Sequence, residues 1–173
     1  MAAKKYLKVG TTGIEEQAAT TSSAGAANEG DLVALDAAGK LALNMMPAGV
    51  GPATKSIVAS EAMTAPCLVN VWNDAGTTKV RYADASAASA AKRAHGFILV
   101  SATLGNPVAV YFEGEVTGLT GLTGGTTMFL SNSVPGGTQN TAVITAGHIL
   151  QEIGVATSTT SLDFEPAKPI LRS

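Results

Sequence analysis

Residues Ala94 to Pro166 decide the fold, and they read AHGFILVSATLGNPVAVYFEGEVTGLTGLTGGTTMFLSNSVPGGTQNTAVITAGHILQEIGVATSTTSLDFEP. Clusters of Gly, Thr, Ser, Asn and Pro separate short apolar runs, which are Phe97–Val100, Val108–Phe112, Met128–Leu130, Ile149–Val155 and Leu162–Phe164. Apolar runs of this length and spacing are typical of consecutive strands in an all-β protein. The stretch therefore predicts a compact β-sandwich or barrel.

The same pattern extends upstream and sets the limits of the body. Leu68–Trp72 and Lys79–Asp84 flank the turn-rich segment Asn73–Thr78, which predicts a hairpin. Prolines at positions 166 and 169 cannot continue a central strand, so the last residues should run along the surface. We expect a β body over residues 56–166 and a C-terminal tail over 167–173.

A glycine-rich segment, GLTGLTGG at Gly118–Gly125, lies inside this body. It lacks the Lys-Ser or Lys-Thr that completes a phosphate-binding loop, and a strand-like run follows it. We expect Leu119 and Leu122 to fill the core while the glycines allow tight turns.

The N-terminal part of the chain has a different character. Residues 1–30 are too polar and too poor in large apolar side chains to fold alone, which predicts an extended arm, with a short helix over Ile14–Thr20 as the alternative. Residues 31–55 should form a small hairpin, Leu32–Leu35 with Lys40–Ala42, followed by a linker. Gly39 is available for a positive φ in its turn.

Composition limits what the core can contain. Only 5% of the 173 residues are aromatic and 14% are charged, although 46% are hydrophobic. Much of the apolar fraction is alanine, which buries little surface per residue. The core should then rest on a few large side chains, chiefly Phe97, Tyr111, Phe112, Phe129, Phe164, Trp72 and Tyr82. Such a chain gains stability from burial against other subunits, so we expect an oligomer.

Charge and cysteine content exclude several classes of protein. A formal net charge of −2 lacks the basic field of a nucleic-acid binder. The single cysteine, Cys67, can form no intrachain disulfide and is expected to be a small buried residue. The sequence has neither an apolar stretch of membrane-spanning length nor a secretory signal, so we expect no membrane contact and synthesis in the cytosol.

Side chains that could perform chemistry are few and scattered. His95 and His148 each precede an apolar run, and neither has a second His or Cys at metal-ligand spacing. Glu113 and Glu115 flank a glycine and should lie on the same side of one strand, which is not the arrangement of an acid/base pair. We therefore expect no catalytic residue, no metal and no cofactor, and interpret the chain as a structural protein.

Several segments resemble a known family. They are Ala94–Phe97, Tyr111–Gly114, Gly118–Thr123, and Ile153–Ala156 leading to Leu162–Phe164, with Leu35–Leu41 and Met46-Pro47 upstream. Together they resemble the β module of virion structural proteins of tailed bacteriophages: head decoration (cement) proteins, head fibres and tail fibres. The resemblance covers about two thirds of the chain.

The resemblance implies a non-enzymatic protein of the virion, assembled in the host cytoplasm and located on the capsid surface. The chain lacks the repeats or heptads of a fibre shaft, which favours a decoration protein that bridges and stabilises major capsid protein subunits. A short head- or tail-fibre tip that binds a host receptor or carbohydrate is the alternative. The expected partners are the major capsid protein and further copies of the chain, in a trimer. The segment expected to bind the partner is Lys4, Lys5, Tyr6, Leu7, Lys8 and Val9.

Overall fold

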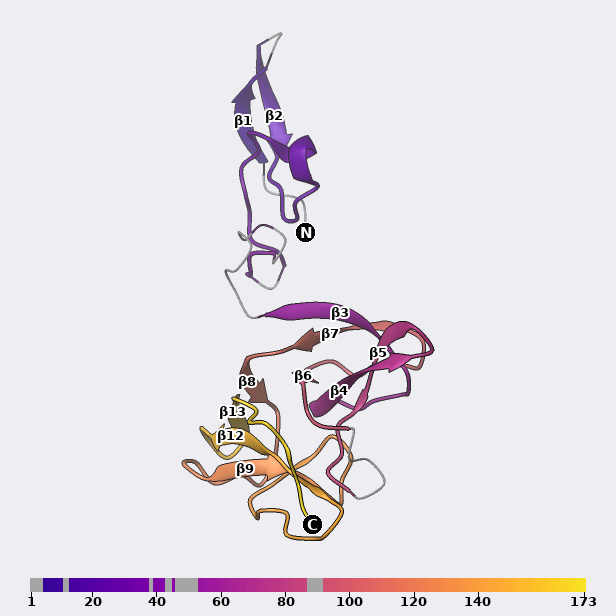
Figure 1. Ribbon diagram of the computed structural model, residues 1–173. Helices are drawn as coiled ribbons and strands as arrows, with labels where there is room; N and C mark the ends of the chain where they lie inside the picture. Colours follow the sequence, from indigo (N-terminus) through magenta and orange to yellow (C-terminus); the bar gives the residue numbers. More distant parts are fainter. Residues whose placement is uncertain (1–4, 11–12, 38, 43–44, 46–52, 87–91) are drawn as a thin grey trace. The chain divides into compact units, whose positions relative to one another are not determined.

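Strands are the main regular secondary structure of the chain in its computed structural model, which describes residues 5–10, 13–37, 39–42, 45, 53–86 and 92–173 (Figure 1). The predicted all-β class is confirmed. Helical structure among the described residues is limited to 3-10 turns, as at η1 (Gly25–Asn28). The chain divides into an N-terminal unit, Met1–Gly51, and a C-terminal unit, Pro52–Ser173.

A closed barrel forms the first half of the C-terminal unit. Its strands, in barrel order, are β3 (Thr54–Ala59), β5 (Thr77–Tyr82), β4 (Cys67–Asp74), β6 (Gly96–Ile98) and β7 (Pro107–Tyr111). The predicted hairpin is present as β4 and β5, which pair from Val69–Tyr82 to Asp74–Thr77. Ala75 and Gly76 both have positive φ in its two-residue turn, as a type I′ hairpin requires.

A five-stranded antiparallel sheet forms the second half. Its strand order is β10 (Thr138–Gln139), β9 (Thr127–Leu130), β12 (Glu152–Ala156), β13 (Ser161–Phe164) and β8 (Gly114–Thr117). A separate short ladder joins β11 (Ile149–Leu150) to β14 (Ile170–Leu171), so the tail 167–173 adds a strand that the sequence did not predict. Both residues of β14 are exposed, as expected for a tail at the surface.

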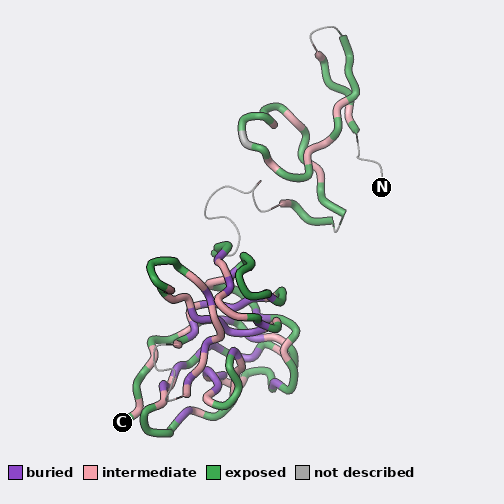
Figure 2. Tube along the Cα trace, turned by 90° about the vertical axis from the view of Figure 1, so that its right-hand side faces the viewer, coloured by how far each residue is buried: buried purple, intermediate pink, exposed green. Residues whose placement is uncertain are grey.

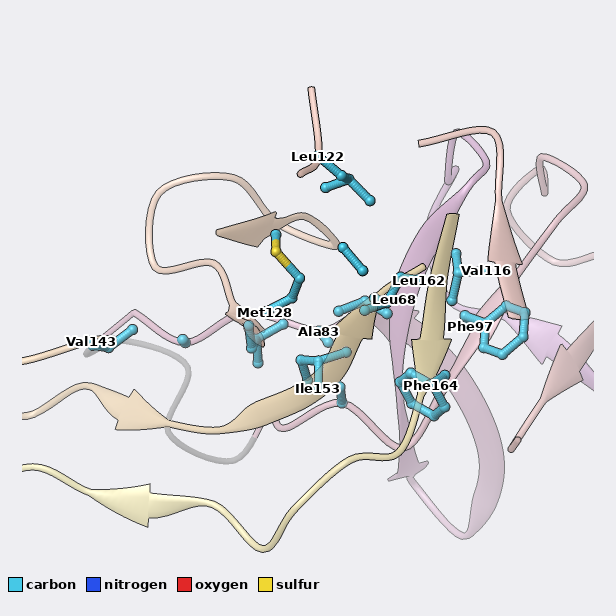
Figure 3. Close-up of a cluster of buried hydrophobic side chains, with 14 of the residues drawn as sticks. Leu68, Ala83, Phe97, Val116, Leu122, Met128, Val143, Ile153, Leu162 and Phe164 are labelled. Carbon is cyan, nitrogen blue, oxygen red and sulfur yellow. The ribbon is translucent and has the colours of Figure 1, made fainter. Parts of the chain in front are cut away.

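Two hydrophobic clusters occupy this unit, and strand alternation separates them. Along β4, Cys67 and Val69 belong to the barrel cluster, whereas Leu68 belongs to the cluster shared with the second sheet. On β6, Ile98 belongs to the barrel cluster and Phe97 to the shared cluster. Successive side chains of a strand point to opposite faces, so these strands are buried on both faces and read as continuous apolar runs. Figure 3 shows the shared cluster, with side chains from both sheets in contact.

Aromatic side chains supply less of the core than predicted. Phe97 and Phe164 are buried, with ring centroids 5.3 Å apart in an edge-to-face contact. The others named in the prediction are half-buried: Tyr111, Phe112, Phe129, Trp72 and Tyr82. Branched aliphatic residues and alanines fill the interior instead, because short strands in a narrow barrel leave little room for rings. As expected, Leu122 is buried in the shared cluster, and the partly buried Leu119 packs against that cluster.

The N-terminal unit is not the extended arm that composition predicted. Two strands, β1 (Lys5–Val9) and β2 (Ile14–Ala18), form an antiparallel hairpin. The alternative of a helix over Ile14–Thr20 is wrong, since these residues form β2 and end at a parallel bridge between Thr20 and Val33. Cross-strand pairing with β1 has overridden the helix propensity of the Glu-Glu-Gln-Ala segment.

Only part of the expected second hairpin is present. The turn forms as predicted: Asp36 N–H donates to the carbonyl of Lys40 (2.8 Å), and Gly39 has a φ of +72°. Its described flanks form no ladder with each other. Most of the expected linker lies outside the described residues, and its expected end at Lys55 falls within β3.

Candidate functional site

The predicted partner-binding segment lies largely on strand β1. Lys4 is outside the described residues, and the other five form β1. The Lys5 ammonium lies 2.7 Å from the Glu16 carboxylate on the paired strand. This basic group therefore already has an acidic partner within its own unit.

The carboxylate of Asp31 is the common acceptor in a network of polar side chains in the N-terminal unit. It accepts hydrogen bonds from Asn28 (3.0 Å), Thr20 (3.1 Å) and the Tyr6 hydroxyl (3.3 Å), and the Lys8 ammonium lies 4.0 Å away. Hydrogen bonds from Asn28 and then Thr20 stabilise the charged form, so the pKa of Asp31 is lowered below its ordinary value. The network ties β1 to the segment that follows η1, and the sequence analysis missed it entirely.

The hairpin has two different faces. Directly paired residues share a face, so Tyr6 and Lys8 are directed to the face that contacts Asp31. The opposite face carries Leu7, Val9 and Ile14, together with the ion pair Lys5–Glu16; we call it the open hairpin face. Leu7 is 75% exposed, Val9 85% and Ile14 74%, so no described residue of the N-terminal unit covers them.

Exposure is general throughout the N-terminal unit. None of its described residues is buried, whereas the C-terminal unit contains both hydrophobic clusters (Figure 2). Besides the open hairpin face, the unit exposes Leu32, Val33, Leu35 and Leu41. Contiguous exposed apolar side chains in a soluble protein mark a surface that contacts something else.

The two histidines occupy separate hydrogen-bonding sites. His95 Nδ1 accepts the backbone N–H of Val71 (3.1 Å) and lies 3.2 Å from the amide nitrogen of buried Asn70. Burial and then the nearby positive charge of Arg93 lower the pKa of His95. His148 Nδ1 instead lies 3.3 Å from the amide nitrogen of Asn132. Each imidazole has a structural hydrogen-bonding role.

Glu113 and Glu115 do not lie on one strand, and that prediction is wrong. The chain bends after Tyr111, and Gly114 starts β8 with a φ of +109°. Glu113 accepts the backbone N–H of Ala53 (3.2 Å), whereas Glu115 accepts the Thr157 hydroxyl (2.9 Å). The positive φ of the glycine breaks the alternation that the sequence argument assumed.

The half-buried aromatic side chains that could stack on a sugar ring make contacts within the protein. Trp72 donates its indole N–H to the Ser60 hydroxyl (3.1 Å) and lies 4.3 Å from the Arg81 guanidinium. Tyr82 accepts the Thr64 N–H (2.7 Å), and Tyr111 stacks on Phe97. All three rings are half-buried; Tyr82 packs against the barrel cluster and Tyr111 against the shared cluster.

One cleft of the C-terminal unit is lined mainly by hydroxyl and amide groups. Its volume is about 210 Å³, and its lining residues are Thr120, Gly121, Leu122, Thr123, Thr126, Met128, Thr138, Gln139 and Asn140. Hydroxyl and amide groups of this kind hydrogen-bond sugar hydroxyls. The cleft lacks an aromatic wall, which a sugar site commonly uses for stacking.

The described ranges contain no group of three or more His, Cys, Asp or Glu side chains able to hold a metal ion. Within the same ranges, no helix has the length and hydropathy needed to cross a bilayer. The chain matches no family model, no curated protein and no solved structure.

Proposed function

We propose that this chain is a non-enzymatic virion structural protein of the capsid-decoration (cement) type, which bridges and stabilises major capsid protein subunits. One contrast supports the proposal above all: a unit with its own core is joined to a unit in which no described residue is buried. The C-terminal unit can fold by itself and be displayed. The N-terminal unit needs a partner surface, and attachment to the shell is its role in this proposal.

Self-association belongs to the same proposal. Each copy carries one attachment unit in which no described residue is buried, so its affinity for the shell as a monomer should be low. Several units in one oligomer raise the overall affinity through effective concentration. A trimer suits the threefold positions of an icosahedral shell, and closed cyclic symmetry is the norm for homo-oligomers.

The absence of enzymatic activity also belongs to the proposal. Its support is that His95, His148, Glu113 and Glu115 have separate hydrogen-bonding partners. No two of them contact a common group in these hydrogen bonds. Alanine substitutions at these four positions should change stability or assembly, and leave virion infectivity intact when shell stability and occupancy are normal.

The direct test is the location and effect of the protein on virions. Antibody raised against Pro52–Ser173 and coupled to gold should label heads of intact virions uniformly. Shells prepared without the protein should disrupt at lower temperature than shells to which the full chain has been added back. Label confined to the tail, or shells of equal stability with and without bound protein, would contradict the decoration role.

A fibre tip that binds a host receptor or carbohydrate is the second candidate, and the cleft around Thr123 and Gln139 favours it. The test is binding of the full chain to host surface polysaccharide, with Gln139→Ala as the cleft variant and Asn73→Ala as an exposed control. Binding that is lost only in Gln139→Ala would support this candidate over decoration.

A further inference from the structure

A row of polar side chains crosses the outer face of the barrel strands, from β5 over β4 to the start of β6. Arg81 on β5 is directly paired with Asn70 on β4, and His95, just before β6, lies beside Asn70. The neighbour of Asn70, Val69, belongs to the barrel cluster, so alternation turns Asn70 to the opposite face. Two of the chain's three arginines, Arg81 and Arg93, have contacts in this row.

The buried side chain of Asn70 fixes the members of the row. Its Oδ1 accepts the Nε–H of Arg81 (3.0 Å), and its Nδ2 donates to the backbone carbonyl of Arg93 (2.8 Å). The Arg81 guanidinium also lies 4.3 Å from the centre of the Trp72 ring. These contacts hold Arg81 in place through its Nε–H and its flat face, and they leave its terminal N–H groups without an acceptor among the described residues.

The hydrogen bonds of His95 determine which ring nitrogen carries the proton. Its Nδ1 accepts the Val71 N–H (3.1 Å), and a second donor, the amide nitrogen of Asn70, lies 3.2 Å from the same atom. A neutral imidazole has one acceptor nitrogen and one N–H, so the proton of His95 is on Nε2. Burial and then the charge of Arg93 lower the pKa of His95, which favours this neutral form.

This proton position leaves two hydrogen-bond donors facing each other. The Nε–H of Arg93 is directed at His95 Nε2 from 2.7 Å, although Nε2 itself carries a proton. Neither N–H group has another acceptor among the described residues. Arg93 is exposed, so its side chain can shift and admit an oxygen atom that accepts both protons. The arrangement therefore lacks an acceptor at one defined point.

Charge around this point is positive. No ion pair between described residues involves Arg81 or Arg93. Lys79, on the same face as Arg81, is neutralised by Asp74 at 2.7 Å. Asp84, three positions after Arg81, directs its carboxylate to the N–H and hydroxyl of the residue two positions later, at 2.9 and 3.2 Å. The two guanidinium groups thus favour an acceptor that is itself negatively charged.

We propose that Arg93 and His95, with Arg81 beside them, form a binding site for an oxyanion, which is a carboxylate, sulfate or phosphate group of a larger molecule. One oxygen of the group accepts the Nε2–H of His95 and an N–H of Arg93. A second oxygen accepts from the remaining N–H groups of the Arg93 fork, since a guanidinium binds such groups through two parallel hydrogen bonds. The site lies within the C-terminal unit and does not depend on the decoration role.

The test is NMR spectroscopy of the full chain, with the imidazole signals of His95 and His148 followed as sodium sulfate or sodium acetate is added. Sodium chloride at equal ionic strength is the reference, because every salt screens charges. An oxyanion at Nε2 stabilises the charged imidazole, so the pKa of His95 should rise as the anion binds. The change should saturate, and the pKa of His148 should not follow it.

Two variants that remove the same charge separate the site from a general effect of charge. Arg93→Gln should weaken binding of the anion about tenfold or more, because it removes the charged donor. Lys55→Gln, on β3, is the matched control and should bind as the unmodified chain does. Both positions are exposed, and the dispersion of the same spectra verifies that each variant is folded.

Each outcome decides the proposal. A response of His95 to acetate assigns carboxylates as ligands, and a response to sulfate alone assigns tetrahedral groups; either supports the site. No saturable response beyond that to chloride would overturn it, as would an undiminished response in Arg93→Gln. Equal responses of His95 and His148, or equal losses in Arg93→Gln and Lys55→Gln, would show a general effect of salt or charge and would also overturn it.

Discussion

The side-chain amide of Gln151 pairs with the backbone of Ala94, 57 positions earlier, as a neighbouring strand would. Its Oε1 accepts the Ala94 N–H (2.8 Å), and its Nε2 donates to the Ala94 carbonyl (3.0 Å) and to that of Ala167 (3.1 Å). One buried side chain thus holds both the segment before β6 and the segment before β14.

Replacement of Gln151 by Leu should destabilise the C-terminal unit by about 2–3 kcal/mol, because the buried backbone groups of Ala94 lose their partners. Urea denaturation followed by the fluorescence of Trp72 measures the change. Exposed Asn140→Ala is the control and should change the free energy of unfolding by less than about 0.5 kcal/mol. Equal effects of the two variants would contradict the assigned role.

Gly154 is the position of the second sheet that should tolerate a side chain least. Its φ is +139°, and an added Cβ would collide with the carbonyl oxygen of Asp163 on the paired strand. Gly154→Ala should cost at least about 3 kcal/mol in thermal or urea unfolding. Gly124→Ala is the matched control, since a Cβ there makes ordinary contacts with Thr157 and should be nearly neutral. A Gly154→Ala protein as stable as the control would contradict this packing.

Strand alternation explains how much of the fold was predictable. Leu68 and Val69 serve different clusters, so their run is apolar throughout and was correctly predicted as a strand. Strand β2 was expected to be either extended or helical, because Glu15, Glu16 and Gln17 favour a helix and only pairing with β1 makes them a strand. Local sequence does not encode that pairing.

The candidate site was less predictable than the fold. Lys5 and Lys8 stood out as a basic group, yet their acidic neighbours, Glu16 and Asp31, come from later in the chain. The Tyr6–Asp31 contact spans 25 residues and has no local signature. The open hairpin face became recognisable only once the register had placed Ile14 beside Val9.

The stability of the C-terminal unit should fall as the pH drops below about 6.5, the ordinary pKa of a histidine, because protonation of His95 favours the unfolded chain. Its pKa is lowered in the folded protein, so between that lowered value and 6.5 the unfolded chain binds more protons. The stabilisation is complete above this window and is lost through it as the pH falls. His95→Asn keeps an acceptor for Val71 N–H and cannot titrate, so its free energy of unfolding should vary less from pH 7 to 5.5. An equal pH dependence in both proteins would contradict the role of His95.

Cys67 should be unreactive in the folded protein. Burial, and then the negative charge of Glu61, raise the pKa of its thiol to about 12, so little thiolate exists at pH 8. Ellman's reagent should label no thiol in the native chain and one thiol after urea unfolding. Exposed Val100→Cys should react at once in the native state, with a stoichiometry of one. Rapid labelling of native Cys67 would show that this end of the barrel opens.

The central claim is that the N-terminal unit attaches a separately folded β body to the shell. Shell occupancy by the full chain and by a chain lacking Met1–Gly51 tests it most directly, with Trp72 fluorescence and thermal unfolding to verify that the shortened chain is folded. The account predicts a cooperatively unfolding β body that no longer binds shells at concentrations that saturate them with the full chain. A shortened chain that binds at full occupancy would contradict it and assign attachment to the C-terminal unit.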